Sequence, residues 1–356
     1  MVKRLIFIVC LISFKGFSFQ EDSLKHKIGI LPSVFYTPET RLGFGGLIYS
    51  HFKTKLNDTL TKKSNTQSYF SYTINKQFSI ANDYQIWLKK NYVYLTGTIE
   101  YSKFPSFFYG IGNNTKESDK MMVYFDVFKT QTKSLVKISN KFYGGILFHY
   151  QKVADKTSDF MPDNLCAEMY GNMGFQTKGI GSIIMLDNRN NPLNPSKGYY
   201  IEASYTDYKS IFNNKNMFTN LIIDLRRYHT FLRKLIWNGN LYMAFNKGNV
   251  PYLLQAEIGG PRFLRGYYRG RFRSNNVIIA QQEFRMPVYK AFGLAVFGGI
   301  GEVASTINQF KKNQIHYSYG AGLRIRINKK ENSNIRIDYG ITKDSQGLYV
   351  VFAEAF

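Results

Sequence analysis

Cysteine is nearly absent from this sequence, which contains only Cys10 and Cys166 among its 356 residues. Cys10 lies in an N-terminal segment that we expect to be removed on export. Cys166 is then the single cysteine of the mature chain, so an intrachain disulfide is excluded.

The N-terminal segment has the layout of a secretory signal peptide. Lys3 and Arg4 precede an apolar run from Leu5 to Phe14, and small and aromatic residues follow it. The run is about half of the ~20 residues that a membrane-spanning helix needs, which argues against a membrane anchor. We expect a signal peptide at residues 1–19 and a mature chain that starts near residue 20.

Long apolar runs are missing from the rest of the chain, so membrane-spanning helices are not expected there. An exported chain without them is either a soluble protein or a barrel that crosses the membrane with strands. Aromatic residues make up 17% of the sequence. Because Tyr and Phe surround membrane barrels at both interfaces, this content favours the barrel.

Acidic residues are scarce: 47 Lys and Arg face 24 Asp and Glu, which gives a net charge of +23. The basic residues are spread along the chain in ones and twos and do not gather in one helix or tail. We therefore expect no nucleic acid as partner. An anionic surface of outer-membrane lipids and lipopolysaccharide, or a polar lumen, suits this distribution better.

Motifs of common catalytic sites are also missing. The sequence has no Gly-x-Ser-x-Gly, no His-Glu-x-x-His and no glycine-rich phosphate loop before a lysine. Its histidines lie far apart, at His26, His51, His149, His229 and His316. We expect no enzymatic activity, no cofactor and no metal. An outer-membrane enzyme such as a barrel lipase is the weaker alternative, because a histidine that faces a lumen is more often a polar lining residue.

The sequence does contain many segments in which apolar and polar residues alternate with a period of two. Between residues 315 and 328, Tyr319 and Leu323 share an apolar face, while Ser318 and Arg324 share the polar one. A single strand of this kind fits a soluble sandwich as well as a barrel, so length and number have to decide. Many segments reach the ~9 to 11 residues with which a tilted strand crosses a bilayer. Strands are predicted at residues 28–36, 41–53, 66–75, 81–90, 91–101, 121–138, 142–152, 179–187, 198–208, 216–229, 234–246, 276–287, 291–303, 315–327, 333–341 and 347–356.

The joins between these segments alternate in length from the fourth strand onward, as in outer-membrane barrels with short periplasmic turns. Two joins fit less well, because 54–65 is long where a short turn is expected and 187–197 is long for a turn. We predict an all-β fold: a single transmembrane antiparallel β-barrel of about 16 strands at residues 28–356, in the bacterial outer membrane. A short periplasmic extension is expected at residues 20–27.

The last predicted strand ends on an aromatic residue, Phe356, as is common in outer-membrane barrels. Phe352 and Val350 lie on the same face, and Glu354 interrupts this apolar stripe. The alternative is an edge strand that happens to end in phenylalanine.

The longest join, residues 247–275, combines glycines, arginines and aromatics. Several arginines placed close together need carboxylates near them, which predicts a loop that folds into the barrel lumen. The alternation places Glu283 and Asp338 on the inner face of the wall. A bidentate contact between Arg265 and Glu283 is the leading prediction, with Asp338 in reserve. A solvated external loop that binds anionic lipopolysaccharide is the alternative. The residues singled out in the loop are Gly259, Gly260, Arg262, Leu264, Arg265, Gly266, Tyr267 and Gly270.

These residues carry a resemblance to a known family. The stretch Gly259–Gly270, with Leu264-Arg265-Gly266-Tyr267 at its centre, resembles the inward-folded sixth extracellular loop of BamA/TamA-type outer-membrane assembly barrels, the bacterial surface antigen family. It falls between predicted strands 11 and 12, as in that family. Residues 276–356 are similar to the family's five closing strands.

A second motif also resembles the family. Its periplasmic turn reads Asp-x-Arg-Asp, then Pro, then Gly. Here Asp187, Arg189, Pro192 and Gly198 match, while Asn190 replaces the second acid.

Two departures from the family pattern stand out. Gly299, ahead of Gly301, occupies the place of an inward aspartate on the thirteenth strand, and the adjacent Glu302 should face the opposite side. One expected partner of Arg265 is therefore missing. We also expect the chain to lack the polypeptide-transport-associated (POTRA) domains of its relatives, because only about eight residues separate the signal peptide from the first strand.

The resemblance implies a role in outer-membrane biogenesis, meaning insertion or translocation of polypeptides. Unfolded outer-membrane proteins would be its clients and periplasmic proteins its partners. It also implies a weak seam between the first and last strands, residues 28–36 and 347–356, that opens sideways. A passive or plugged pore is the runner-up function, and a structural or surface-binding barrel is the third.

Overall fold

The computed structural model describes residues 26–55, 58, 60–155, 170–171, 173–211, 216–231, 234–328 and 333–356. The predicted signal peptide at residues 1–19 lies outside the described residues, as does most of the predicted extension at 20–27. The first strand begins at His26, two residues before the predicted start of the barrel.

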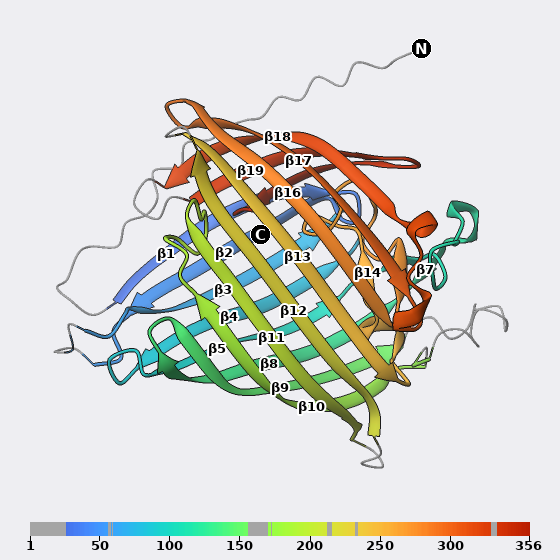
Figure 1. Cartoon of the computed structure of the whole chain (residues 1–356), viewed down its shortest axis with the longest axis horizontal. Helices are drawn as coiled ribbons and strands as arrows, with labels where there is room; N and C mark the ends of the chain where they lie inside the picture. The colour runs from blue at the N-terminus through green and yellow to red at the C-terminus, as the bar shows by residue number, and fades with distance from the viewer. Residues whose placement is uncertain are drawn as a thin grey trace.

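Sixteen strands of the described chain form one closed barrel in which all neighbours are antiparallel (Figure 1), so the predicted fold class is confirmed. The barrel strands are β1 (His26–Thr37), β2 (Arg41–Phe52), β3 (Ser64–Thr73), β4 (Phe78–Leu88), β5 (Val93–Lys103), β8 (Phe125–Ser139), β9 (Phe142–Asp155), β10 (Phe175–Asp187), β11 (Gly198–Ser210), β12 (Asn216–Phe231), β13 (Leu235–Gly248), β16 (Asn276–Tyr289), β17 (Phe292–Ala304), β18 (His316–Asn328), β19 (Ser333–Thr342) and β20 (Gln346–Phe352).

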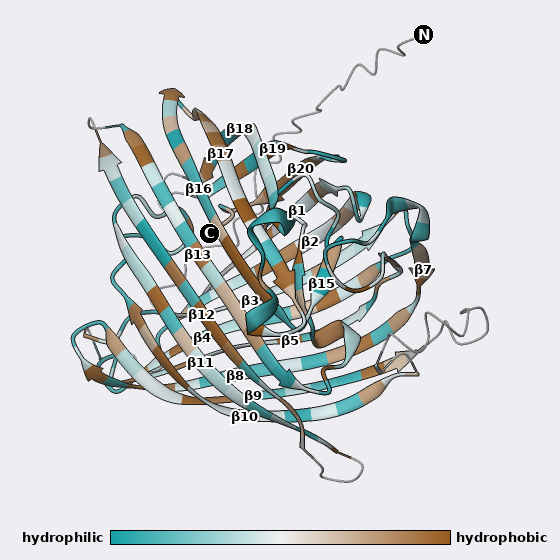
Figure 2. Cartoon of the chain, turned by 45° about the vertical axis from the view of Figure 1, so that its right-hand side comes forward, coloured by the Kyte–Doolittle hydropathy of each residue, from teal (hydrophilic) through white to brown (hydrophobic). Residues whose placement is uncertain are grey.

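The alternation of the sequence becomes the two faces of this wall. Along the strands, apolar and polar residues follow one another in bands (Figure 2). On β18 the side chain of Leu323 is 45% exposed on the outside, while its neighbour Arg324 is 4% exposed on the inside. An exposed apolar exterior around a polar interior is the arrangement that suits a wall surrounded by lipid. None of the helices in the described residues is long and apolar enough to cross a membrane.

Two long joins carry short strands of their own at one end of the barrel (Figure 1). β6 (Ser106–Phe108) pairs with β7 (Met121–Val123), and β14 (Ala256–Ile258) pairs with β15 (Phe272–Ser274). The prediction of a single strand over residues 121–138 was therefore wrong, because this range is divided between β7 and the separate barrel strand β8. Four three-residue 3-10 helices complete the described elements: η1 (Glu117–Asp119), η2 (Tyr252–Leu254), η3 (Ile307–Gln309) and η4 (Lys312–Gln314).

The last strand is shorter than predicted, because β20 ends at Phe352 and not at Phe356. Ala353 adopts a positive φ of 63°, which turns the chain out of the strand. Glu354 then reaches Arg324 on the inner face, with 2.8 Å between Oε2 and Nε. Phe356 is only 7% exposed, so it does not continue the outer apolar stripe.

The seam between the first and last strands is the weakest junction in the wall. A single residue pair, Tyr36 with Val350, joins β1 to β20. By contrast, β19 and β20 share seven residue pairs, and β1 and β2 share twelve. Within the part of the chain that the structure describes, most of the β1 edge that faces β20 thus has no partner strand.

The seam predicts an uneven pattern of hydrogen exchange. In an antiparallel strand the amides point alternately to the two neighbours, so about half of those in residues 26–35 point to the unpaired edge. We expect this half to exchange rapidly in the purified protein while β12, paired on both sides, stays protected. Residue-resolved exchange measurements check this. Uniform protection of β1 and β12 would contradict an unpaired seam.

Candidate functional site

The segment 249–275 joins the eleventh and twelfth barrel strands, β13 and β16, and we call it the lumen loop. Hydrogen bonds from inward-facing wall residues hold the backbone of its tip. Ser318 Oγ donates to Arg265 O at 2.6 Å. Gly266 N donates to the Tyr349 hydroxyl at 2.9 Å, and that hydroxyl donates to Tyr267 O at 3.1 Å. The tip therefore lies against the inner face of β18 and β20.

Glycine makes this close approach possible. Gly266 adopts a φ of +117°, which side chains disfavour. Opposite it on β19, a Cβ added to Gly340 would lie 2.3 Å from Arg265 O. Two backbones meet here with no side chain between them, so the Arg265-Gly266 pair can lie flat on the wall.

Arg265 contacts both carboxylates that the sequence singled out, each through one nitrogen, so the predicted bidentate contact with Glu283 alone is not formed. Its Nη2 lies 2.7 Å from Glu283 Oε2, and its Nη1 lies 2.5 Å from Asp338 Oδ2. The guanidinium also stacks on Phe297, 3.5 Å from the ring centre. Arg265 is 2% exposed, and such burial of a charge is tolerable only when it is paired in this way.

The ion pair of Arg265 belongs to a larger buried cluster. Arg324 reaches Asp338 at 2.6 Å and Glu283 at 3.2 Å, and Arg336 reaches Asp338 at 2.6 Å. Glu354 accepts from Arg324 and lies 3.3 Å from Arg285. Four guanidinium groups thus share three carboxylates, and the lumen loop contributes one of the four.

The turn motif at the opposite end of the barrel joins the same network. Arg189 donates to Asp187 through Nε at 2.9 Å and Nη2 at 2.7 Å, which closes the start of the turn. Gly198 ends the turn with a φ of +104°, while Pro192 is exposed. Arg285 donates to Asn194 Oδ1 at 2.7 Å and to Pro195 O at 2.5 Å. The turn 188–197 is therefore tied, through Arg285, to the cluster that holds the loop.

The other loop arginines also find partners, mostly ones that the sequence did not indicate. Arg262 lies 2.9 Å from Asp224 on β12. Arg273 and Arg269 both contact Glu257 of β14. Burial disfavours the charged form of Glu257, but the charges of Arg273 and Arg269 outweigh it and hold its pKa at about 2. The loop thus has an internal ion-pair centre besides the anchor on the wall.

Asp224, Glu257 and Glu354 are partners that the sequence analysis did not assign. The first two contact loop arginines, and Glu354 contacts Arg324 and Arg285 of the wall. Glu354 had a visible signal, because it interrupts an apolar stripe while Arg324 faces the lumen without an assigned partner. For Asp224 the signal was the alternation along β12, which places its side chain on the inner face of the wall. Glu257 had none, since its neighbour Arg273 is brought close only by the pairing of β14 with β15.

Gly299 explains how the loop fits without the aspartate expected on the thirteenth strand, β17. A Cβ at Gly299 would lie 2.7 Å from Gln281 Cβ and 2.8 Å from Leu264 Cδ2. Leu264, which is 1% exposed, fills the space that a side chain at Gly299 would take. Glu302 accepts instead from Lys311 N at 2.7 Å. Here apolar packing occupies the position of the missing acid.

The lumen loop also contacts both sides of the seam. Tyr349, which holds Gly266 and Tyr267, belongs to β20. Glu39, in the turn between β1 and β2, accepts from Arg269 N at 2.7 Å, and burial raises the pKa of this carboxyl. Three peptide groups of the loop between Arg265 and Arg269 therefore link β20 to the turn that follows β1.

A neighbouring join covers the loop. Gly112 N donates to Arg273 O at 2.7 Å, and Arg271 Nη1 donates to Thr115 Oγ1 at 2.6 Å. Asn113 links this join to Val303 and His316. Within the described ranges, no group of three or more His, Cys, Asp or Glu side chains is placed to hold a metal ion.

Comparison with known proteins agrees with this architecture. The sequence profile of the Omp85 superfamily domain matches residues 32–352. Among solved structures, BamA from Haemophilus ducreyi lacking POTRA domains 1–3 is similar, with a TM-score of 0.62 and 14% identity over 94% of this chain and 71% of that one. A search of curated protein sequences found no match.

Two further solved structures are similar to the chain. CdiB from Escherichia coli has a TM-score of 0.63 and 10% identity, over 91% of this chain and 62% of that one. CdiB from Acinetobacter baumannii has a TM-score of 0.55 and 13% identity, over 91% of this chain and 65% of that one. The chain therefore spans just under two thirds of the CdiB structures. At these identities the likeness concerns the fold.

We expect Arg265→Ala to release the loop tip from the wall. Breaking a buried ion pair costs up to about 3–5 kcal/mol. Arg324 and Arg336 would still contact Glu283 and Asp338, so the loss here comes from the missing contacts of the loop tip and from the space left beside Phe297. Arg262→Ala is the matched control, because the side chain of Arg262 is 44% exposed and Asp224 keeps Arg226 as its partner. We expect this variant to lose only ~0–1 kcal/mol of the free energy of unfolding. Limited proteolysis of residues 249–275 and thermal unfolding measure both variants. Equal protease resistance of Arg265→Ala and wild type would contradict the anchor.

Glu257 predicts how the loop responds to acid. A carboxyl whose pKa is lowered in the folded state stabilises that state above its ordinary pKa of 4.5, and the contribution is lost as the pH falls towards about 2. Glu257→Gln lacks this contribution at every pH. Pepsin cleavage of the loop should therefore be faster in the variant at pH 4.5, and the two proteins should converge near pH 2. A difference that grows as the pH falls would contradict the assignment.

Proposed function

The chain belongs to the Omp85 superfamily and is an outer-membrane β-barrel; we propose that it inserts or translocates polypeptides there by opening the seam between β1 and β20. The observation that carries the proposal is the single residue pair, Tyr36 with Val350, across that seam. The role needs no catalytic group.

An unpaired strand edge in lipid is costly, because water is not available to satisfy the free backbone N–H and C=O groups. Residues 26–35 of β1 present such an edge. An extended segment of a client polypeptide that pairs with β1 would satisfy these groups, as in other cases of recognition by strand addition. Client binding is then favoured at the seam over any fully paired position in the wall.

The lumen loop supplies the restraint that such a seam requires. Tyr349 on β20 and Glu39 beside β1 are held by neighbouring peptide units of the loop, so the two strands stay close although their ladder is short. Opening would break these hydrogen bonds and leave the buried cluster around Arg265 intact. The barrel wall and the gate would thereby be stabilised by separate contacts.

The network around Arg285 suggests where periplasmic partners would act. Short turns of outer-membrane barrels face the periplasm. The turn 188–197 contacts Arg285, and Arg285 lies beside Glu354, two residues beyond β20. A periplasmic protein that docks on this turn would therefore touch the same network as the end of the last strand.

A plugged or passive pore is the second candidate, and one observation favours it. The lumen loop and the join 104–124 lie against each other at one end of the barrel. Such a plug would restrict a channel and line it with arginines, which favours anions. In this case the seam would stay shut.

A disulfide across the seam separates the two functions. Directly opposed residues of antiparallel strands lie within the range that a disulfide bridges, so Tyr36→Cys with Val350→Cys should lock the seam when oxidised. Expressed as the sole copy in a Cys166→Ser background, this variant should lower the amounts of other barrel proteins in the outer membrane. Reduction should restore them.

The control is a matched pair, Ala203→Cys with Ile223→Cys, which cross-links β11 to β12 away from the seam. It should leave the amounts of other barrel proteins in the outer membrane unchanged. Normal levels of other barrel proteins with a locked seam would refute the proposal. Large, steady, anion-selective currents from the purified protein in planar bilayers would establish the pore instead.

A further inference from the structure

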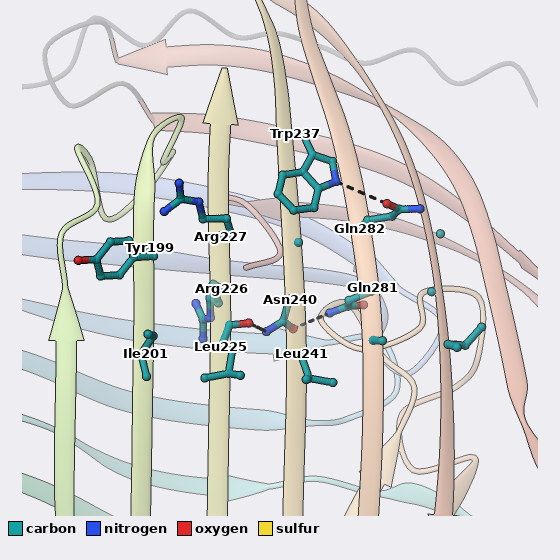
Figure 3. A pocket seen from close by; sticks show the side chains of 15 residues that line it. Tyr199, Ile201, Leu225, Arg226, Arg227, Trp237, Asn240, Leu241, Gln281 and Gln282 are labelled. Atoms are coloured by element: carbon teal, nitrogen blue, oxygen red, sulfur yellow. Dashed lines mark hydrogen bonds between the residues drawn. The ribbon is translucent and has the colours of Figure 1, made fainter. Parts of the chain in front are cut away.

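The outer face of the wall carries a hollow of about 870 Å³ across β11, β12, β13, β16 and β17 (Figure 3). Most of the residues around it point away from the lumen, as the buried inward neighbours Asp224, Asn238 and Glu283 show by alternation. We call it the outer hollow. It lies apart from β1 and β20 and shares no residue with the lumen loop.

One end of the outer hollow is polar. Arg227 is exposed there, and its guanidinium lies 5.7 Å from the ring centre of Tyr199. Trp237 Nε1 donates to Gln282 Oε1 at 3.4 Å beside it. These residues lie near the end of β12 and the starts of β11 and β13, at the side of the barrel with the short join 232–234. Exposed lysines, Lys197 and Lys234, occur in the two adjoining joins.

The other end is apolar. Ile201, Leu225 and Leu241 line it, towards the middle of the wall (Figure 3). Ile300 also belongs to the lining. The floor is low at Gly298, which carries no side chain, whereas the Trp237 ring lies over Gly239. A Cβ at Gly298 would meet nothing closer than Ser318 O at 3.6 Å, so the space is real and open to a larger side chain.

Arg227 is the unusual group, because an arginine on the lipid-facing side of a barrel costs up to ~2–4 kcal/mol near the bilayer midplane and less near the interface. Within the described residues its one recorded partner is the ring of Tyr199, and no carboxylate pairs with it. Its neighbour Arg226, on the inner face, pairs with Asp224. Arg227 is therefore available to pair with an anionic group from outside the protein.

We propose that the outer hollow binds one anionic glycerophospholipid. Its phosphate would contact Arg227, with Trp237 and Gln282 beside the glycerol region, and an acyl chain would lie along Leu225, Leu241 and Ile300. Charge complementarity selects the anionic headgroup. The position of Arg227 on the short-turn side selects a phospholipid of the periplasmic leaflet, since short turns face the periplasm.

Native mass spectrometry of the full chain with an equimolar mixture of phosphatidylglycerol and phosphatidylethanolamine tests this proposal. Wild type should retain phosphatidylglycerol preferentially. Arg227→Gln should lower its apparent affinity roughly fivefold, which corresponds to the ~1 kcal/mol expected per basic residue near an anionic lipid surface, and should abolish the preference. Gly298→Leu should fill the hollow and weaken retention of both lipids.

Lys178→Gln is the control, because Lys178 lies on the outer face of β10 near its opposite end and its loss removes the same charge. The proposal is supported if Lys178→Gln retains phosphatidylglycerol as the wild type does while Arg227→Gln does not. Equal retention of the two lipids by wild type overturns it, as does unchanged binding in Arg227→Gln and Gly298→Leu. Displacement of phosphatidylglycerol by lipid A would overturn the phospholipid assignment, and displacement by inorganic phosphate would show that the acyl chain contributes nothing.

Discussion

The ion pairs of Arg265 with Glu283 and Asp338 are the constraint on which the rest of this barrel depends. They place the tip of a 27-residue join against the wall, between strands that are far apart in the sequence. A guanidinium is planar and offers five donors, so it can bind two carboxylates and still stack on Phe297. All three charges are buried, so each needs a partner of opposite charge. Loss of Arg265 would detach the loop tip, while Arg324 and Arg336 would still neutralise Glu283 and Asp338.

From this anchor the loop reaches both sides of the seam. The wall is strongest where strands share long ladders and weakest between β1 and β20, where one residue pair remains. Gly266 N and Arg269 N of the loop donate to the Tyr349 hydroxyl and to Glu39, and these hydrogen bonds replace part of the missing ladder. The side chains that hold the loop and the backbone groups that close the seam are therefore different contacts. Under the proposed function, the seam would open without displacing the lumen loop from the wall.

The two faces of the wall place neighbouring residues in opposite environments. Arg226 and Arg227 are consecutive on β12, yet one pairs with Asp224 inside and the other faces the outer hollow. Inside, every arginine of the cluster around Asp338 has a carboxylate within reach. Outside, Arg227 has an aromatic ring and an empty amphipathic space. The same strand thus serves the lumen network and, in our proposal, a lipid site.

Much of the architecture is determined by the sequence alone, because the side chains of a strand alternate with a period of two. The number of strands, their approximate positions, the inward direction of Glu283 and Asp338 and the place of the long join all follow from that local rule. Tertiary structure alone decided the rest. The residue pairing across the seam, the contact of Glu257 with Arg273 and the turn of Glu354 into the lumen depend on closure of the barrel and on one positive φ at Ala353. These features join residues that are distant along the chain, and the periodicity of the sequence leaves a trace of only one of them, the interruption of an apolar stripe at Glu354.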